Sequence, residues 1–137
     1  MIFLGILVVG FAAIQLVPVS RTNPPVTSEP NWDSPETRAL AQRACFDCHS
    51  NETQWPWYAY VAPVSWLVSH DTIEGRQRLN FSEWDSMRGE ARETHEIIEV
   101  ILEGEMPPSN YVRMHPEANL TDAERSQLVE GLRATLR

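Results

Sequence analysis

Residues 45–50 read CFDCHS, and this hexapeptide contains both cysteines of the 137-residue chain. The two thiols stand three positions apart, and His49 follows the second of them directly. Residues three and four apart lie on one face of a helix, so a helical turn here would present two thiols and an imidazole to the same neighbouring group. The hexapeptide therefore predicts a binding site built on a single turn of backbone.

Three kinds of site use a C-x-x-C pair, and the rest of the chain separates them. A structural zinc site needs four ligands, but there is no second cysteine pair, and His70, His95 and His115 are widely spaced. A thioredoxin-like dithiol is found in a βαβ context, whereas the chain shows helical patterns and no alternating strand pattern of useful length. The third site is covalent haem attachment, for which C-x-x-C-H is the known pattern.

Covalent haem also explains the spacing chemically. Haem carries two vinyl groups on one side of its ring, so two thiols one helical turn apart can each form a thioether to one vinyl. We expect Cys45 and Cys48 to hold one haem c in this way, with His49 as the proximal axial ligand of the iron. The thioethers would consume both thiols, so no disulfide is expected. Because such attachment takes place outside the cytoplasm, we expect a periplasmic haem domain.

The sixth ligand of the iron has two principal candidates. Met106 stands in the stretch ILEGEMPPSNY, directly before two prolines that stiffen the backbone and remove two amide donors. A rigid loop with few donors suits a thioether that must be held against a haem face. His70, in the largely apolar stretch WLVSHDTI, is the rival. The choice matters because Met/His ligation gives a higher reduction potential than imidazole on both faces.

The N-terminal segment is strongly apolar. Residues 2–17 read IFLGILVVGFAAIQLV and contain one polar side chain, Gln15. A membrane span needs about 17 to 25 residues, so we expect residues 1–19 to be a single-pass anchor in the bacterial cytoplasmic membrane. A cleaved signal peptide is the competing interpretation, although no small-x-small cleavage site follows. Residues 20–32, with three prolines, predict a tether to the haem domain, residues 33–137.

The remaining residues carry helix signals. Pro35 suits the first position of a helix that leads into the cysteine pair. A long helix is expected over residues 82–104, and Thr121 with Glu124 forms a capping box for the last helix. The fold class predicted from these patterns is all-α, with one helical domain behind one transmembrane helix.

Charge restricts the partners. The formal net charge is -8 and the sequence pI is about 4.9. This excess of carboxylates argues against nucleic acid as a partner, because phosphates are bound by cationic surfaces. If long-range electrostatic steering contributes to association, the partner surface should be basic.

Several strings beyond the hexapeptide resemble one family, the haem-binding-domain family of small membrane-anchored bacterial c-type cytochromes. They are CFDCHSNET, WPWY, VAPVSWLVSHD, LNFSEW, GEMPPSNY and HPEANLT. The resemblance covers residues 30–135 and implies a cytochrome-c-like helical domain with one covalent haem. It implies the same roles for Cys45, Cys48 and His49, and it places Met106 in the methionine ligand loop. His70 also stands in a family-like string, so the sixth ligand stays open.

The function expected from these features is one-electron transfer. A haem with two protein ligands has no open coordination position, so we expect an electron carrier and not an enzyme. Its partners would be redox proteins, as membrane complexes that it connects or as a respiratory or photosynthetic complex of which it is a fixed subunit. The alternative is a haem-based ligand sensor or a peroxidase, which would need an open or displaceable sixth site.

Overall fold

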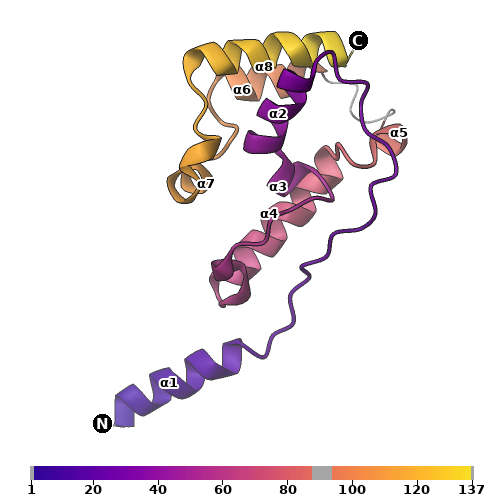
Figure 1. The fold of residues 1–137 in the computed structure, drawn as a ribbon. Helices are drawn as coiled ribbons and strands as arrows, with labels where there is room; N and C mark the ends of the chain where they lie inside the picture. Colours follow the sequence, from indigo (N-terminus) through magenta and orange to yellow (C-terminus); the bar gives the residue numbers. More distant parts are fainter. Residues whose placement is uncertain (1, 88–93, 137) are drawn as a thin grey trace.

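The computed structural model describes residues 2–87 and 94–136, and the elements in these ranges are helices joined by loops (Figure 1). The one pairing of extended backbone among them is an isolated bridge between Ser28 and Glu83. The all-α prediction is confirmed for the described residues. In chain order the elements are α1 (Ile2–Ile14), α2 (Pro35–Ala44), α3 (Phe46–His49), η1 (Trp57–Tyr60), α4 (Val64–Arg78), α5 (Trp84–Met87), α6 (Thr94–Leu102), α7 (Ser109–Met114), η2 (Pro116–Ala118) and α8 (Asp122–Thr135).

The core forms where α8 packs against α2 and α6. A close crossing is possible there because Gly131 of α8 faces Thr37 of α2, and a Cβ at Gly131 would collide with the threonine side chain. Aromatic rings of α3 and the loop after α4 extend this core, with the Phe46 and Phe81 ring centroids 5.6 Å apart. Its buried members include Leu40, Ala41, Phe46, Phe81, Ile98, Ile101, Leu128 and Leu132.

Local capping explains why α2 and α8 begin where they do. The Ser34 side chain accepts a hydrogen bond from the Thr37 amide, and Pro35 occupies the first helical position. The capping box of Thr121 and Glu124 is present in both directions. Both predicted helix starts are therefore confirmed.

The helix predicted over residues 82–104 is seen as two shorter described elements, α5 and α6. Residues 88–93, which would join them, lie outside the described residues. Gly104 ends this region as predicted, because its φ of 74° is the left-handed conformation that glycine adopts without a steric cost.

The predicted transmembrane anchor is wrong. At 1.5 Å per residue the 13 residues of α1 extend about 20 Å, whereas the hydrocarbon core of a bilayer is about 30 Å thick. No helix within residues 2–87 and 94–136 is long and apolar enough to cross a membrane. Helix α1 ends before Gln15, whose side-chain amide bonds to both the carbonyl (3.2 Å) and the N–H (2.9 Å) of Ala62. The single-pass membrane localisation that we predicted is therefore overturned.

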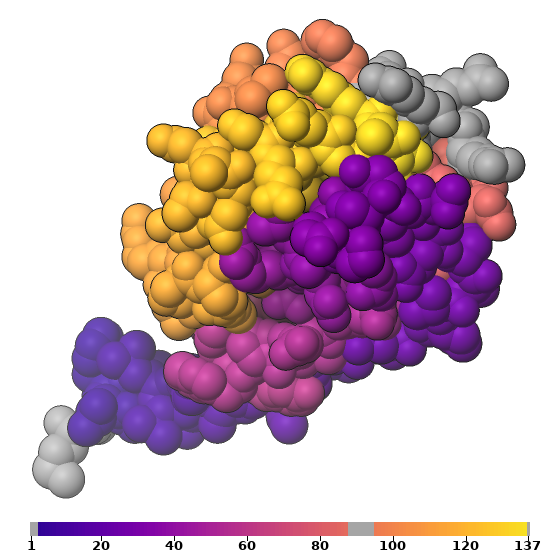
Figure 2. All heavy atoms as spheres, turned by 45° about the horizontal axis from the view of Figure 1, so that its top comes forward, coloured from indigo at the N-terminus to yellow at the C-terminus, as the bar shows by residue number. Residues whose placement is uncertain are grey.

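The proline-containing stretch after α1 lies against the helical domain (Figure 2). The Thr27 amide donates to the Ser82 carbonyl at 2.9 Å. Farther along, the Trp32 ring packs against the core, with its centroid 5.2 Å from that of Phe81. The division of the chain at residues 19 and 32 remains a prediction, but much of residues 20–32 contacts the domain in the structure.

Arg76 of α4 fastens this stretch to the loop that follows the CFDCHS turn. Its guanidinium donates to the Ser50 carbonyl (2.7 Å) and to the Thr53 hydroxyl (2.8 Å). It also donates to the Thr22 carbonyl (2.8 Å) and to Oδ1 of Asn23 (3.0 Å). One planar cation thus joins the loop after α3 to the stretch after α1, a geometry that lysine cannot reproduce.

We expect Arg76→Ala to lower the free energy of unfolding by about 2 kcal/mol, because several hydrogen bonds to one charged group are lost together. Residues 20–27 should at the same time become more sensitive to protease. Urea unfolding and limited proteolysis with mapped cleavage sites measure the two effects. Arg78→Ala is the matched control, since Arg78 is exposed on the same helix. If Arg76→Ala and Arg78→Ala have the same free energy of unfolding and the same protease sensitivity, Arg76 does not hold this stretch in place.

Candidate haem site

The CFDCHS turn lies at the junction of α2 and α3. Cys45 ends α2, and α3 contains the other cysteine and the histidine. The amides of Cys48 and His49 both donate to the Cys45 carbonyl, at 3.2 and 2.9 Å. The predicted single turn is therefore present, and neither thiol forms a disulfide.

His49 is oriented by the end of α4. Its Nδ1 lies 3.0 Å from the Gly75 carbonyl oxygen and 3.1 Å from the Leu79 carbonyl oxygen. Because carbonyl oxygens only accept hydrogen bonds, Nδ1 carries the proton and donates it, which leaves the lone pair on Nε2. Burial lowers the pKa of the imidazole, and a neutral ring is the form that binds a metal. The two carbonyls thus hold the His49 ring with Nε2 unprotonated, which is the arrangement that carbonyl partners give to metal-ligating histidines.

Gly75 also sets how closely α4 approaches the CFDCHS turn. A Cβ at this position would lie 2.5 Å from the carbonyl oxygen of Cys48, a contact that no side chain could make without movement of the backbone. The absence of a side chain therefore lets α4 approach closely enough for its carbonyls to reach His49. The sequence did not show that Gly75 permits this close approach or that its carbonyl orients His49. Its single signal was a glycine inside a helical stretch.

The two thiols are poorly suited to other chemistry. Burial raises the pKa of Cys45 to about 12 and that of Cys48 to about 11, the latter with a contribution from the charge of Asp47. Both pKa values lie above that of an ordinary free cysteine, whereas the cysteines of disulfide exchange have lowered pKa values. Within the described residues no three or more His, Cys, Asp or Glu side chains form a group that could hold a metal ion. These observations weigh against the zinc and dithiol interpretations.

Met106 lies on the loop between α6 and α7. The amides of Glu105 and Met106 both donate to the Val100 carbonyl, at 2.9 and 3.1 Å, which fastens the start of the loop to α6. Met106 is 39% exposed. It lines a pocket together with Cys45, and the other lining residues are Ala44, Ile101, Pro107, Leu120, Arg125 and Leu128. The structure thus brings the predicted methionine ligand and one of the two predicted attachment cysteines to the same pocket.

His70 is placed differently. Its side chain is 64% exposed on α4, and its Nε2 lies 3.5 Å from a carboxylate oxygen of Glu74. It does not line the pocket that Cys45 shares with Met106. The identity of the sixth ligand is not tested by this arrangement, but Met106 is the candidate whose position fits.

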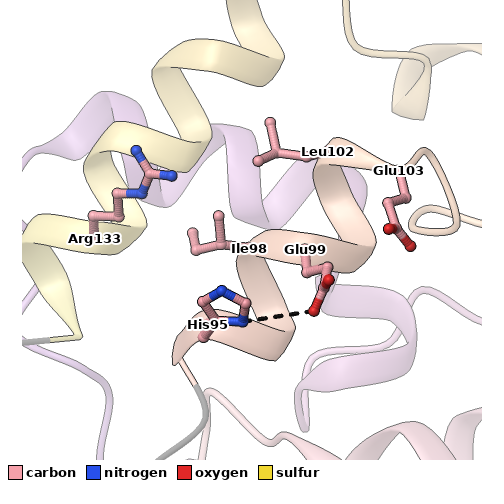
Figure 3. A pocket seen from close by; sticks show the side chains of 6 residues that line it. All are labelled: His95, Ile98, Glu99, Leu102, Glu103 and Arg133. Carbon is pink, nitrogen blue, oxygen red and sulfur yellow. Dashed lines mark ion pairs between the residues drawn. The ribbon is translucent and has the colours of Figure 1, made fainter.

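A second pocket lies between α6 and α8 and contains none of the predicted ligands (Figure 3). Its lining residues are His95, Ile98, Glu99, Leu102, Glu103 and Arg133. The His95 ring points toward Glu99, with 3.5 Å between Nδ1 and a carboxylate oxygen. His95 therefore belongs to a solvent-exposed ion pair on α6.

A family model described as a haem-binding domain matches residues 9–134. The chain belongs to the haem-binding domain family. The match begins within α1 and ends within α8, so it includes the CFDCHS turn and the Met106 loop. The family resemblance is thus confirmed at the level of haem binding, whereas membrane anchoring and covalent attachment are not confirmed by it. Searches of curated proteins and of solved structures found no match.

The residues of this haem-binding domain fit the cofactor. Two unpaired thiols stand one turn apart, and the imidazole beside them presents a free Nε2. A thioether side chain lines the pocket that contains one of the thiols. If haem is bound here, Cys45 and Cys48 would hold its vinyl carbons, His49 would ligate its iron, and Met106 is the candidate for a second iron ligand.

Proposed function

We propose that this haem-binding domain protein is a monohaem c-type cytochrome that transfers single electrons. The observation that carries the proposal is the pocket that Cys45 shares with Met106, together with His49, four residues after Cys45, whose Nδ1 is already bonded. If His49 and Met106 both ligated the iron, no position would be left for a substrate, and electron transfer would be the chemistry that remains.

The chain's own residues would keep the site in one geometry. Bound haem iron supplies the redox chemistry by alternating between two oxidation states. The carbonyls of Gly75 and Leu79 hold the His49 ring and its Nδ1 proton in place. On the other side, Pro107 and Pro108 restrict the backbone that follows Met106. Ligands that stay in place on both faces would reduce the rearrangement that accompanies a change of oxidation state.

The partner that we propose is a redox protein with a basic docking surface. The net charge of -8 favours electrostatic attraction to such a surface and disfavours nucleic acid.

One observation favours the second candidate function, a ligand-binding or peroxidatic haem. Met106 is 39% exposed and lies on a loop, so an external ligand could reach the iron if the methionine were displaced. A sensor or peroxidase would use this displacement.

Carbon monoxide discriminates between the two functions. We expect the reduced, haem-loaded protein to bind carbon monoxide slowly or not at all, because Met106 would have to leave the iron first. A potentiometric titration of the same sample should show a single one-electron step. Rapid carbon monoxide binding by the folded protein would contradict electron transfer through a closed site and support the alternative.

A further inference from the structure

A hydrogen bond connects the attachment turn to the helix after the Met106 loop. The Tyr111 hydroxyl on α7 donates to Oδ2 of Asp47 at 2.7 Å. Asp47 lies between the two cysteines, and its other oxygen, Oδ1, accepts from the Gln54 amide at 2.9 Å. The carboxylate is therefore fixed on one side by the loop after α3, and Tyr111 binds to an oxygen that is already oriented.

This bond holds the far end of the Met106 loop. The near end is held by the Val100 carbonyl, which accepts from two successive amides of the loop. Pro107 and Pro108 follow, and neither has an amide proton with which to make a further bond. Helix α7 then begins at Ser109, so Tyr111 sits within its first turn. The loop that contains Met106 is thus held at its near end by a backbone contact to α6 and at its far end by a side-chain contact to α3.

The Tyr111 ring is itself supported. It stacks on the ring of His115, with centroids 4.3 Å apart and planes inclined by 13°. The Nε2 of His115 lies 2.6 Å from the Tyr58 hydroxyl, which joins α7 to η1. Burial raises the pKa of Tyr111 far above its usual value, and the hydrogen bond to Asp47 acts in the same direction. The phenol therefore keeps its proton and remains a donor at physiological pH.

We propose that Tyr111 and Asp47 form a clamp that closes the Met106 loop over the attachment turn and opposes displacement of Met106 from the haem iron. The clamp rests on the proposed function, since it needs Met106 as the ligand. Neither residue would touch the iron, so both are positioning residues. Opening the loop would break a hydrogen bond to a carboxylate, a stronger class of bond than a neutral pair.

Imidazole binding to the oxidised, haem-loaded protein measures how easily Met106 is displaced. We expect Tyr111→Phe to bind imidazole roughly tenfold or more tightly than the unaltered protein, the ratio that corresponds to the loss of one charge-assisted hydrogen bond. Asp47→Ala should have an effect at least as large, because it also removes the acceptor of the Gln54 amide. The double variant should differ little from Asp47→Ala, because both substitutions remove the bond between Tyr111 and Asp47. Tyr60→Phe is the matched control, since Tyr60 is 59% exposed.

The outcomes separate the clamp from the proposed function. Met106→Ala should bind imidazole more tightly than any clamp variant; if it binds like the unaltered protein, Met106 is not the ligand and the proposed function is at fault. If Met106→Ala behaves as expected while Tyr111→Phe matches Tyr60→Phe, or while the Tyr111 and Asp47 effects simply add, the clamp alone is overturned. If Tyr111→Phe fails to load haem, the test passes to Asp47→Ala. The clamp is then supported if Asp47→Ala binds imidazole roughly tenfold or more tightly than the unaltered protein, and overturned if it does not.

Discussion

Gly75→Ala is expected to destabilise the protein by about 2 kcal/mol and to lower its haem content, although helix propensity alone would favour alanine by about 1 kcal/mol. The reason is packing: the new Cβ would lie 2.5 Å from the Cys48 carbonyl oxygen, a backbone atom that cannot rotate away. Helix α4 would have to retreat, and the carbonyls of Gly75 and of Leu79, which directly follows α4, would then no longer hold the His49 ring.

Haem per polypeptide, from the pyridine haemochrome, and the urea midpoint measure the two effects of Gly75→Ala. Gly10→Ala is the matched control, because Gly10 also lies within a helix and a Cβ there would meet nothing within 4 Å. A Gly75→Ala protein that is as stable and as fully loaded as the control would show that close approach of α4 is not needed.

Met106→Ala is expected to abolish the sulfur-to-iron charge-transfer absorption of the oxidised protein. It should also lower the reduction potential by on the order of 100 mV or more, since a thioether ligand favours the reduced iron. Carbon monoxide should then bind rapidly to the reduced form, because the position on the iron would be open. Absorption spectra, potentiometric titration and stopped-flow mixing with carbon monoxide measure these changes.

Two variants control the Met106 experiment. Met114→Ala removes a methionine that is 55% exposed on α7, and it should leave the spectrum unchanged. His70→Ala removes the rival ligand, which the structure places on the exposed face of α4 beside Glu74. If His70→Ala and not Met106→Ala removes the ligand, the assignment of the sixth position is wrong.

The parts of the fold that could be predicted from the sequence are those set by neighbouring residues. The helix start at Ser34 and Pro35 and the capping box of Thr121 and Glu124 are local, and both were confirmed. The N-terminal prediction failed because it rested on hydropathy, which measures composition and not the length of a helix. Helix α1 ends at Ile14, and the next residue, Gln15, hydrogen-bonds to Ala62 far along the chain.

Within the candidate site, too, local features could be predicted from the sequence and long-range contacts could not. The C-x-x-C-H turn is local, so its geometry followed from spacing. The partners of His49 are 26 and 30 residues away, and the Tyr111–Asp47 contact spans 64 residues. No periodicity in the sequence records such contacts, which depend on how α4 and α7 pack. For the same reason the sequence could not separate Met106 from His70, whereas the pocket that Met106 shares with Cys45 favours the methionine.

The most direct measurement is the mass and colour of the denatured polypeptide after washing with acid acetone, which removes haem that is not covalently bound. We expect a coloured chain whose mass exceeds that of the polypeptide by one haem, with no thiol available for alkylation at Cys45 or Cys48. The Cys45→Ser, Cys48→Ser double variant should become colourless after the same wash. A colourless unaltered chain with two alkylatable thiols would contradict covalent haem at the CFDCHS turn.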